Sequence, residues 1–288
     1  MRRRVRSALV ALALLTLATP SLAGPAQGPT RVEIHPSGRN APKTLVAMLY
    51  RPEGQGPFPA VVGLHGCNGL WSTKNSTALN PREADWGARL AALGYVVLFP
   101  DSYGSRGVGA QCRVADRAVE PYRERVADAK AALAYLQGQP FVKAESVVLL
   151  GWSNGGSTVL YAVRPQDRGA DARPDFRAAI AFYPGCRSPY ADGRWRTRMP
   201  LAILIGEADD WTPVGPCRDL AALDKTAVRL TTYPGAFHDF DNPSAAVHEV
   251  RGLAFTAGGN GVAHAGLDPA ARADALARVP ALLSEILK

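Results

Sequence analysis

The sequence predicts a single α/β domain with a mostly parallel central sheet that is covered by helices on both faces. Segments typical of strands and helices alternate along the chain. Several of the strand-like segments are continuous apolar runs, such as 147–150, which is typical of strands buried on both faces. No internal repeat or linker divides the 288 residues, and 47% of them are hydrophobic. One full-sized core is therefore expected.

Each expected element is identified by its pattern and by the residues that end it. Short β-branched or apolar runs bounded by Gly, Pro or polar turns predict strands at 31–34, 44–50, 60–64, 95–99, 147–150, 178–183, 201–205 and 228–233. Apolar residues at helical spacing, with Gly or Pro stops, predict helices at 81–93, 120–137, 154–163, a short stretch ending near 224, and 268–287. The intervening stretches 102–114 and 164–177 are expected to be loops.

The N-terminal residues 1–23 have the pattern of a secretory signal peptide. Four arginines precede the apolar stretch 8–18, and Ser21-Leu22-Ala23 offers a small-residue cleavage site. The apolar stretch is short for a membrane anchor, although an uncleaved anchor or a disordered basic arm remains open as the alternative. Removing residues 1–23 takes away four arginines and no acid, which halves the formal charge of +8. The sequence thus predicts an exported, periplasmic or secreted domain over 24–288 with no nucleic-acid surface.

Four cysteines remain in the expected mature chain, and an even number in an oxidising compartment favours two disulfides. They allow three pairings and are Cys67, Cys112, Cys186 and Cys217. No C-x-x-C spacing is present, so a zinc site is not expected. The glycines of 104–109 lack the spacing of a dinucleotide motif. We expect neither a metal nor an organic cofactor.

The stretch 151–155 reads Gly-Trp-Ser-Asn-Gly and fits the pattern G-x-S-x-G of a nucleophile elbow. A buried strand precedes it and a helix follows at once, which is the setting that this sharp turn requires. Ser153 is therefore the candidate nucleophile. The backbone N–H of Asn154, at the start of the helix, is a candidate donor to a developing oxyanion.

A serine nucleophile needs a base within hydrogen-bond reach, and that base needs an acid to fix its tautomer. Asp209 and His238 each follow a predicted parallel strand, as Ser153 does, and such strand ends share one edge of an open sheet. We therefore expect a Ser153–His238–Asp209 triad. Asp210 is the alternative acid or the cap of the next helix. The three residues could also be an ordinary turn serine, loop histidine and helix-capping aspartate.

Other residues near the expected site have less specific patterns. Arg106 and Arg113 lie in the loop 102–114 and could meet a substrate carboxylate, or they could be solvated loop charges. Four tryptophans could line a pocket or simply pack in the core, namely Trp71, Trp152, Trp195 and Trp211. His35, His248 and His264 have no partner pattern, and no role is assigned to them.

Four segments together resemble the dienelactone hydrolase family of α/β-hydrolases over nearly the whole mature chain. They are Leu-His-Gly-Cys-Asn-Gly at 64–69, Gly-Trp-Ser-Asn-Gly-Gly at 151–156, Gly-Glu-Ala-Asp-Asp-Trp-Thr-Pro at 206–213 and Tyr-Pro-Gly-Ala-Phe-His-Asp-Phe at 233–240. The resemblance implies the α/β-hydrolase fold. It also favours Asp209, three residues after the glycine that ends its strand, and His238. By position in the 64–69 segment, the N–H of Cys67 is the second expected oxyanion donor. His65 is expected to shape that loop rather than to act as the base.

One departure from the family pattern bears on the substrate. The enzymes that gave the family its name use a cysteine nucleophile assisted by a glutamate, whereas this chain has Ser153 at the elbow and Gly66 where the glutamate is expected. A serine needs a histidine base rather than such a carboxylate, so the resemblance implies a carboxylesterase for small esters or lactones. Because each pair follows adjacent strands, we also expect the disulfides Cys67–Cys112 and Cys186–Cys217.

Three alternatives to an esterase remain open from the sequence. A peptidase or an acyltransferase would use the same triad, and a non-catalytic binding protein could share the scaffold. The expected partner is a small-molecule ester. Neither nucleic acid nor a stable membrane anchor is expected, and the sequence leaves the oligomeric state undetermined.

Overall fold

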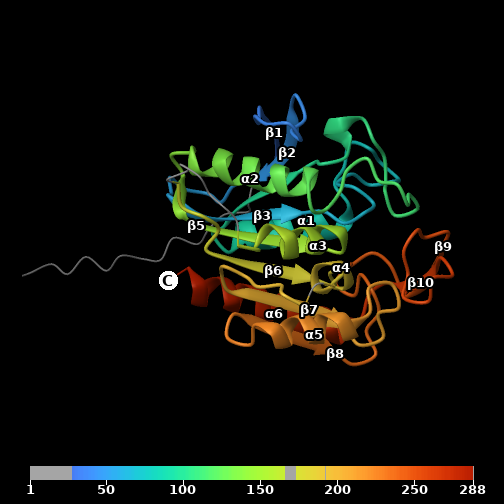
Figure 1. Cartoon of the computed structure of the whole chain (residues 1–288). Coiled ribbons are helices and arrows are strands. Elements are labelled where there is room, and N and C mark those ends of the chain that lie inside the picture. Colours follow the sequence, from blue (N-terminus) through green and yellow to red (C-terminus); the bar gives the residue numbers. More distant parts are fainter. Residues whose placement is uncertain (1–27, 166–172, 192, 288) are drawn as a thin grey trace, which may run out of the picture.

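A computed structural model describes residues 28–165, 173–191 and 193–287. The expected signal peptide and part of the loop 164–177 lie outside these ranges. The described chain folds as one α/β domain around an eight-stranded sheet with the strand order β1-β2-β4-β3-β5-β6-β7-β8 (Figure 1). Within the described ranges, none of the helices is long and apolar enough to span a membrane.

The sheet is parallel except at one edge. β1 pairs antiparallel with β2, and β2 pairs antiparallel with β4, whereas all pairs from β4 to β8 are parallel. The strands are β1 (Thr30–Ile34), β2 (Leu45–Tyr50), β3 (Phe58–Leu64), β4 (Val96–Pro100), β5 (Val142–Trp152), β6 (Ala178–Phe182), β7 (Leu201–Gly206) and β8 (Val228–Tyr233). The α/β-hydrolase fold that the sequence predicted is confirmed.

The burial of the strands explains their sequences. Every residue of β4, β6 and β7 is buried, because helices cover both faces of the central sheet. The edge strand β1 is mostly exposed and carries charged residues at alternate positions. The functional loops therefore extend from a rigid, fully packed centre.

Helices cover the two faces of the sheet (Figure 1). α1 (Pro81–Ala92) and α6 (Pro269–Ile286) lie on one face, where Arg272 of α6 forms an ion pair with Asp85 of α1. α2 (Glu124–Gln137), α3 (Asn154–Ala162) and α5 (Val214–Leu223) lie on the other. The helix expected at 120–137 begins four residues later, because 121–123 form a turn in which the N–H of Glu120 binds the Glu124 carboxylate.

Three small elements were not predicted. They are the 3-10 turn η1 (Gly104–Arg106), the short helix α4 (Arg187–Tyr190), and a hairpin of β9 (His248–Arg251) with β10 (Val262–Ala265). The two hairpin strands have four residues each and β9 is mostly exposed, so neither has a hydrophobic pattern that sequence reasoning can detect. The hairpin lies beyond the C-terminal ends of the parallel strands (Figure 1).

Candidate active site

Ser153 lies on a strained turn between β5 and α3. Its backbone has φ 53° and ψ −116°, a conformation that a non-glycine residue adopts only where the surroundings impose it. Its N–H donates to the carbonyl of Phe182 at the end of β6. The side chain therefore stands above the sheet at the N-terminus of α3.

The glycines of the elbow allow helix and strands to approach each other closely. A Cβ at Gly155 would lie 2.1 Å from the carbonyl oxygen of Leu64, and one at Gly151 would lie 2.4 Å from the carbonyl oxygen of Gly155. Both contacts are with backbone and cannot be relieved by moving a side chain. The spacing of the motif thus follows from packing as well as from the turn.

His238 and Asp209 lie beside Ser153, each in a loop that follows a parallel strand. The Nε2 atom of His238 is 2.9 Å from the Ser153 Oγ, and its Nδ1 atom is 2.8 Å from Asp209 Oδ2. Asp209 Oδ1 accepts the backbone N–H groups of Trp211 and Thr212, which orients the other oxygen towards the ring. All three side chains are nearly buried. This geometry suits a His238 ring that donates from Nδ1 to the Asp209 carboxylate and accepts the Ser153 hydroxyl on Nε2.

Asp210 has a different partner. Its carboxylate lies 2.8 Å from Nδ1 of His264 on β10 and accepts the His264 N–H. It does not cap α5, whose N-cap position is Pro213. Asp209 is thus the aspartate beside His238. Asp210, the next residue in the same loop, binds His264 and so attaches the hairpin to this loop.

The loop after β3 is shaped by His65. This ring is fully buried, and burial together with the nearby Arg125 lowers its pKa well below the usual 6.5. Neutral His65 accepts the N–H of Ser102 on Nε2 and donates from Nδ1 to the carbonyl of Gly66. The expected role in shaping the loop agrees with these contacts.

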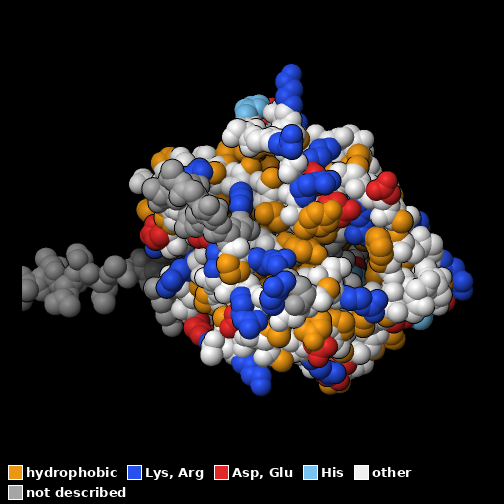
Figure 2. All heavy atoms as spheres, viewed as in Figure 1, with side chains coloured by type: hydrophobic (Ala, Val, Ile, Leu, Met, Phe, Trp, Pro, Cys, Tyr) orange, Lys and Arg blue, Asp and Glu red, His pale blue; other side chains and the backbone are white. Residues whose placement is uncertain are grey.

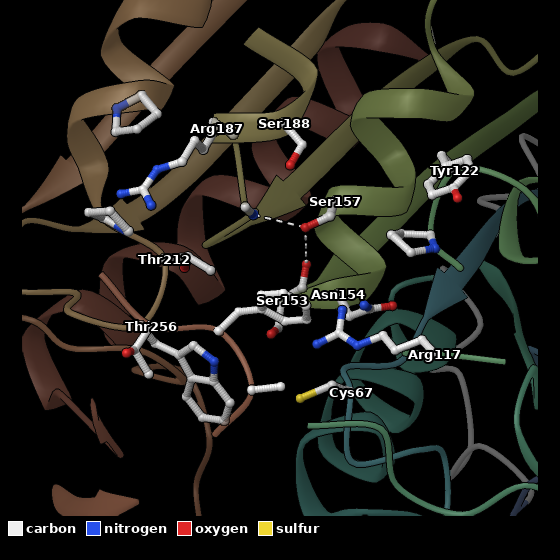
Figure 3. A pocket seen from close by; sticks show the side chains of 18 of the residues that line it. Cys67, Arg117, Tyr122, Ser153, Asn154, Ser157, Arg187, Ser188, Thr212 and Thr256 are labelled. Atoms are coloured by element: carbon white, nitrogen blue, oxygen red, sulfur yellow. Dashed lines mark hydrogen bonds between the residues drawn. The ribbon is translucent and has the colours of Figure 1, made fainter. Parts of the chain in front are cut away.

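The two expected oxyanion donors border the same cavity as the serine. Cys67 follows the loop turn, and Asn154 is the first residue of α3, where backbone N–H groups have no partner within the helix. Within the described residues, neither N–H donates to another protein group. Both are therefore available to an oxygen placed above Ser153. Figure 3 shows the side chains of Cys67 and Asn154 near that of Ser153.

Arg125 joins these two donor segments, and sequence reasoning missed it. Its fully buried guanidinium donates to the side-chain oxygen of Asn154 at 2.5 Å and to the carbonyl of His65 at 2.7 Å. Tyr103 OH donates to the same Asn154 oxygen, and the guanidinium lies over the Tyr103 ring. Arg125 lies on α2, and nothing in the sequence around it distinguishes it from an arginine on the exposed face of a helix.

Asp241 anchors the loop that carries His238, and sequence reasoning did not identify this role. The fully buried carboxylate accepts from Tyr183 OH at 2.5 Å and from the indole N–H groups of Trp86 and Trp152 at 2.7 and 2.9 Å. Burial raises the pKa of Asp241, although Arg82 opposes the shift. Trp152 therefore packs in the core, and its expected place against the substrate is wrong.

Arg106 is also engaged within the protein. Its guanidinium forms two hydrogen bonds of 2.8 Å with the buried Asp128 and donates to the carbonyls of Asn40 and Ser102. The expectation that it meets a substrate is wrong, because these four bonds hold it below the loop surface. Arg113, by contrast, is exposed and borders a cavity beside the serine.

Both expected disulfides are present, Cys67–Cys112 and Cys186–Cys217. The first joins the loop after β3 to the loop after β4 and packs with Leu253 and Ala263 of the hairpin region. The second joins the start of α4 to α5. Each disulfide holds a wall of the site.

Two cavities meet at Ser153, with volumes of about 490 Å³ and about 250 Å³. Ser153, Cys67 and Trp211 border both. Figure 2 shows the surface hollowed beside the hairpin, with hydrophobic side chains around the opening. Trp211 packs on the His238 ring, with 4.7 Å between the ring centroids. The indole of Trp71 donates to Asp101, and that of Trp195 donates to the Leu160 carbonyl. Neither of these two tryptophans borders either of the two cavities. Among the described residues, no group of three metal-ligating side chains is present.

Comparisons with known proteins agree with this architecture. The chain is 26% identical over 216 residues to a Synechocystis sp. protein to which the activity of a carboxymethylenebutenolidase is ascribed, covering 68% of this chain and 81% of that protein. A dienelactone hydrolase-like promiscuous phosphotriesterase from metagenomic libraries superimposes with a TM-score of 0.63 at 24% identity, covering 91% of this chain and all of that one. Esterase 2 of Thermogutta terrifontis, phosphoramylated by tabun, gives 0.60 at 22% identity, covering 94% and 98%.

The sequence profile of the dienelactone hydrolase family matches residues 45–287, which include every strand from β2 onwards and the whole candidate site. The chain therefore belongs to the dienelactone hydrolase family.

Proposed function

We propose that the protein is a serine carboxylesterase that cleaves small esters or lactones through an acyl-enzyme. The observation that carries this proposal is the hydrogen-bonded line from Ser153 Oγ to His238 Nε2 and from His238 Nδ1 to Asp209, at 2.9 and 2.8 Å. Its position in an elbow, beside two free backbone N–H groups and two cavities, suits attack on a carbonyl carbon.

In the acylation step, His238 Nε2 takes the hydroxyl proton as Ser153 Oγ forms a bond to the ester carbon. The carbonyl oxygen gains negative charge and is stabilised by the N–H groups of Asn154 and Cys67. The bond to the leaving oxygen then breaks, and His238 returns the proton to that oxygen. Asp209 stabilises the transient imidazolium.

In the second step, water replaces the leaving group. His238 removes a proton from the water, whose oxygen attacks the acyl carbon. The bond to Ser153 Oγ breaks, and the proton passes to the serine. The acid is released and the starting state restored. These residues account for hydrolysis without a cofactor.

We also propose that the protein is exported, as the pattern of residues 1–23 predicts. Two disulfides join the four cysteines, and disulfides persist in oxidising compartments such as the periplasm. This supports a periplasmic or secreted location.

The test is hydrolysis of a short p-nitrophenyl ester series by the mature protein and by Ser153→Ala. We expect the variant to lose about a thousandfold or more in kcat, because the remaining donors and binding groups give only residual catalysis. Circular dichroism would verify that the variant is folded. Equal activity in both proteins would contradict the proposal. Faster transfer to an added alcohol than to water would indicate an acyltransferase, and cleavage confined to peptide amides would indicate a peptidase.

The two neighbouring aspartates offer a matched pair for the acid. We expect Asp209→Asn to lower kcat by about ten thousandfold, as loss of the correct histidine tautomer does in other serine hydrolases. Asp210→Asn removes a contact to His264 rather than to His238 and should retain most of kcat. The reverse order would assign the acid to Asp210.

A further inference from the structure

The two cavities that meet at Ser153 differ in their relation to His238. His238 borders the smaller cavity and is absent from the lining of the larger one. The larger cavity instead extends past Ser157 towards α4 and α5, and Figure 3 shows Ser188, Arg187 and Tyr122 around it. The acyl and alcohol parts of an ester lie on different sides of the serine during cleavage, so the two cavities can be assigned to the two parts.

The leaving oxygen must accept its proton from His238 Nε2 within hydrogen-bond distance. The alcohol part of a bound ester therefore extends to the side of Ser153 where His238 lies. The acyl part extends to the opposite side, and the carbonyl oxygen points to the N–H groups of Asn154 and Cys67. Given the proposed esterase mechanism, the smaller cavity is the alcohol site and the larger cavity is the acyl site.

The smaller cavity is suited to a small, uncharged, hydrogen-bonding alcohol. Polar and charged side chains make up much of its lining, among them Asn68, Asn80, Arg82, Glu83, Asp239 and Asn242. Its four formally charged lining residues balance, with Arg82 and Arg113 against Glu83 and Asp239. Arg82 forms ion pairs with both acids, and Arg113 donates from Nε to the carbonyl of Arg251. With water occupying about 30 Å³ per molecule, 250 Å³ holds about eight waters or one short polyol.

The larger cavity is suited to a longer acyl chain with a ring or extended apolar part. Tyr122 and Phe255, two aromatic side chains in its lining, are 52% and 53% exposed and are therefore accessible to a bound acyl group. The Arg117 guanidinium packs over the Phe255 ring at 4.7 Å and donates to the carbonyl of Gln111. Arg117 thus supports an aromatic wall of the acyl site.

We propose that the natural substrates are esters of a short, neutral polyol-like alcohol with a bulkier acyl group, and that alcohol and acid are recognised in the separate cavities beside Ser153. This inference rests on the proposed esterase function and adds its substrate class and orientation.

The first experiment compares two esters that differ only in direction. Glyceryl 3-phenylpropanoate has the polar part as alcohol, and 3-phenylpropyl glycerate has it as acid. We expect kcat/KM to be at least about tenfold higher for the glyceryl ester, with activity on both lost in Ser153→Ala. The opposite preference, or none, would overturn the orientation while leaving the esterase function intact. Hydrolysis of neither ester, or equal rates in Ser153→Ala, would instead count against the esterase itself.

The second experiment uses one partly buried alanine from each cavity, Ala245 in the smaller and Ala254 in the larger. Ala245→Phe should lower kcat/KM for the glyceryl ester about tenfold more than for methyl 3-phenylpropanoate, which has the same acid. Ala254→Phe should lower kcat/KM equally for the glyceryl ester and for methyl 3-phenylpropanoate. It should lower kcat/KM far less for methyl acetate.

A crossed result, in which Ala254→Phe discriminates between alcohols and Ala245→Phe between acids, would overturn the assignment. So would equal effects of both variants on all three esters. Melting curves would establish that both variants are folded, and the smaller changes Ala245→Leu and Ala254→Leu serve if either phenylalanine prevents folding.

Discussion

Arg125 is a buried cation that contacts the segments of both proposed oxyanion donors, through hydrogen bonds to the Asn154 side chain and to the His65 carbonyl. We expect Arg125→Met to lower kcat by about ten- to hundredfold with KM nearly unchanged, because a small displacement of the donors weakens transition-state binding more than substrate binding. Steady-state kinetics on a p-nitrophenyl ester would measure the effects on kcat and on KM separately.

Arg106 supplies the matched control for this variant. It is also largely buried and bonded, but to Asp128 and to the carbonyls of Asn40 and Ser102, and in the described part of the chain it forms no hydrogen bond with Asn154 or with the His65 carbonyl. Arg106→Met should lower the melting temperature and leave the kcat of the folded fraction near the wild-type value. If both variants lost kcat to the same extent, Arg125 would have a structural role only.

The buried His65 leads us to expect a specific pH dependence of the free energy of unfolding. Its folded-state pKa lies well below 6.5, so the unfolded chain binds a proton at this site before the folded chain does as the pH falls. The free energy of unfolding should therefore decrease below about pH 6.5, by at most about 1.4 kcal/mol per pH unit from this group.

The control for this pH effect is His65→Gln, which cannot titrate. Urea unfolding curves between pH 8 and pH 5 should show a shallower decrease for the variant, even though it is less stable at pH 8 from lost hydrogen bonds. Identical slopes for the two proteins would exclude His65 as a source of the acid sensitivity.

The sequence predicted which residues would lie together at the site but not every contact that they make. Ser153, Asp209 and His238 each follow a parallel strand, and the C-terminal ends of parallel strands lie at one edge of the sheet. Their positions in the sequence were therefore enough to predict that they lie together. Arg106 was misjudged because its partner Asp128 is 22 positions away on α2, and no local pattern reveals such a pairing. The two buried charges Arg125 and Asp241 escaped notice for the same reason.

At the level of elements, the two disulfides brace different walls of the site. The Cys67–Cys112 loop spans 45 positions and the Cys186–Cys217 loop 31, so chain entropy gives each a similar stabilisation of about 4 kcal/mol. Replacing both cysteines of either pair by alanine should therefore lower the melting temperature comparably.

The two disulfide variants should differ in catalysis. Cys67 supplies an expected oxyanion donor, so loss of Cys67–Cys112 should lower kcat by about tenfold or more at a temperature where the protein is folded. Loss of Cys186–Cys217 affects α4, beside the larger cavity, and should mainly alter KM. A larger kcat loss in the second variant would contradict this division of roles.

The parallel strands and long helices were predictable because apolar runs and helical periodicity persist over many residues. The hairpin β9–β10 was not, although it contributes to the site through the Asp210–His264 pair and the bridge between His238 and Ala265. Its order depends on these distant contacts and on the Cys67–Cys112 disulfide rather than on its own four-residue strands.

At the scale of the whole molecule, Asp241 connects the histidine loop to the centre of the fold. Its carboxylate joins Trp86 of α1, Trp152 of β5 and Tyr183 after β6. We expect Asp241→Ala to lower the free energy of unfolding by about 3 kcal/mol or more, because three buried donors lose their acceptor. Urea unfolding would measure the loss.

Asp241→Asn is the informative companion, since its amide oxygen still accepts from one or two donors. It should be destabilised less than Asp241→Ala. Equal losses would indicate that the charge rather than the acceptor matters.

The edges of the eight-stranded sheet have a consequence for the protein at high concentration. An unpaired edge strand is a template for a strand of another molecule, and charged side chains discourage such pairing. β1 carries the exposed pair Arg31 and Glu33, and β8 at the opposite edge carries Arg229, which pairs with Glu285 of α6. Both edges therefore resist edge-to-edge aggregation, which protects a chain whose central strands are almost entirely apolar.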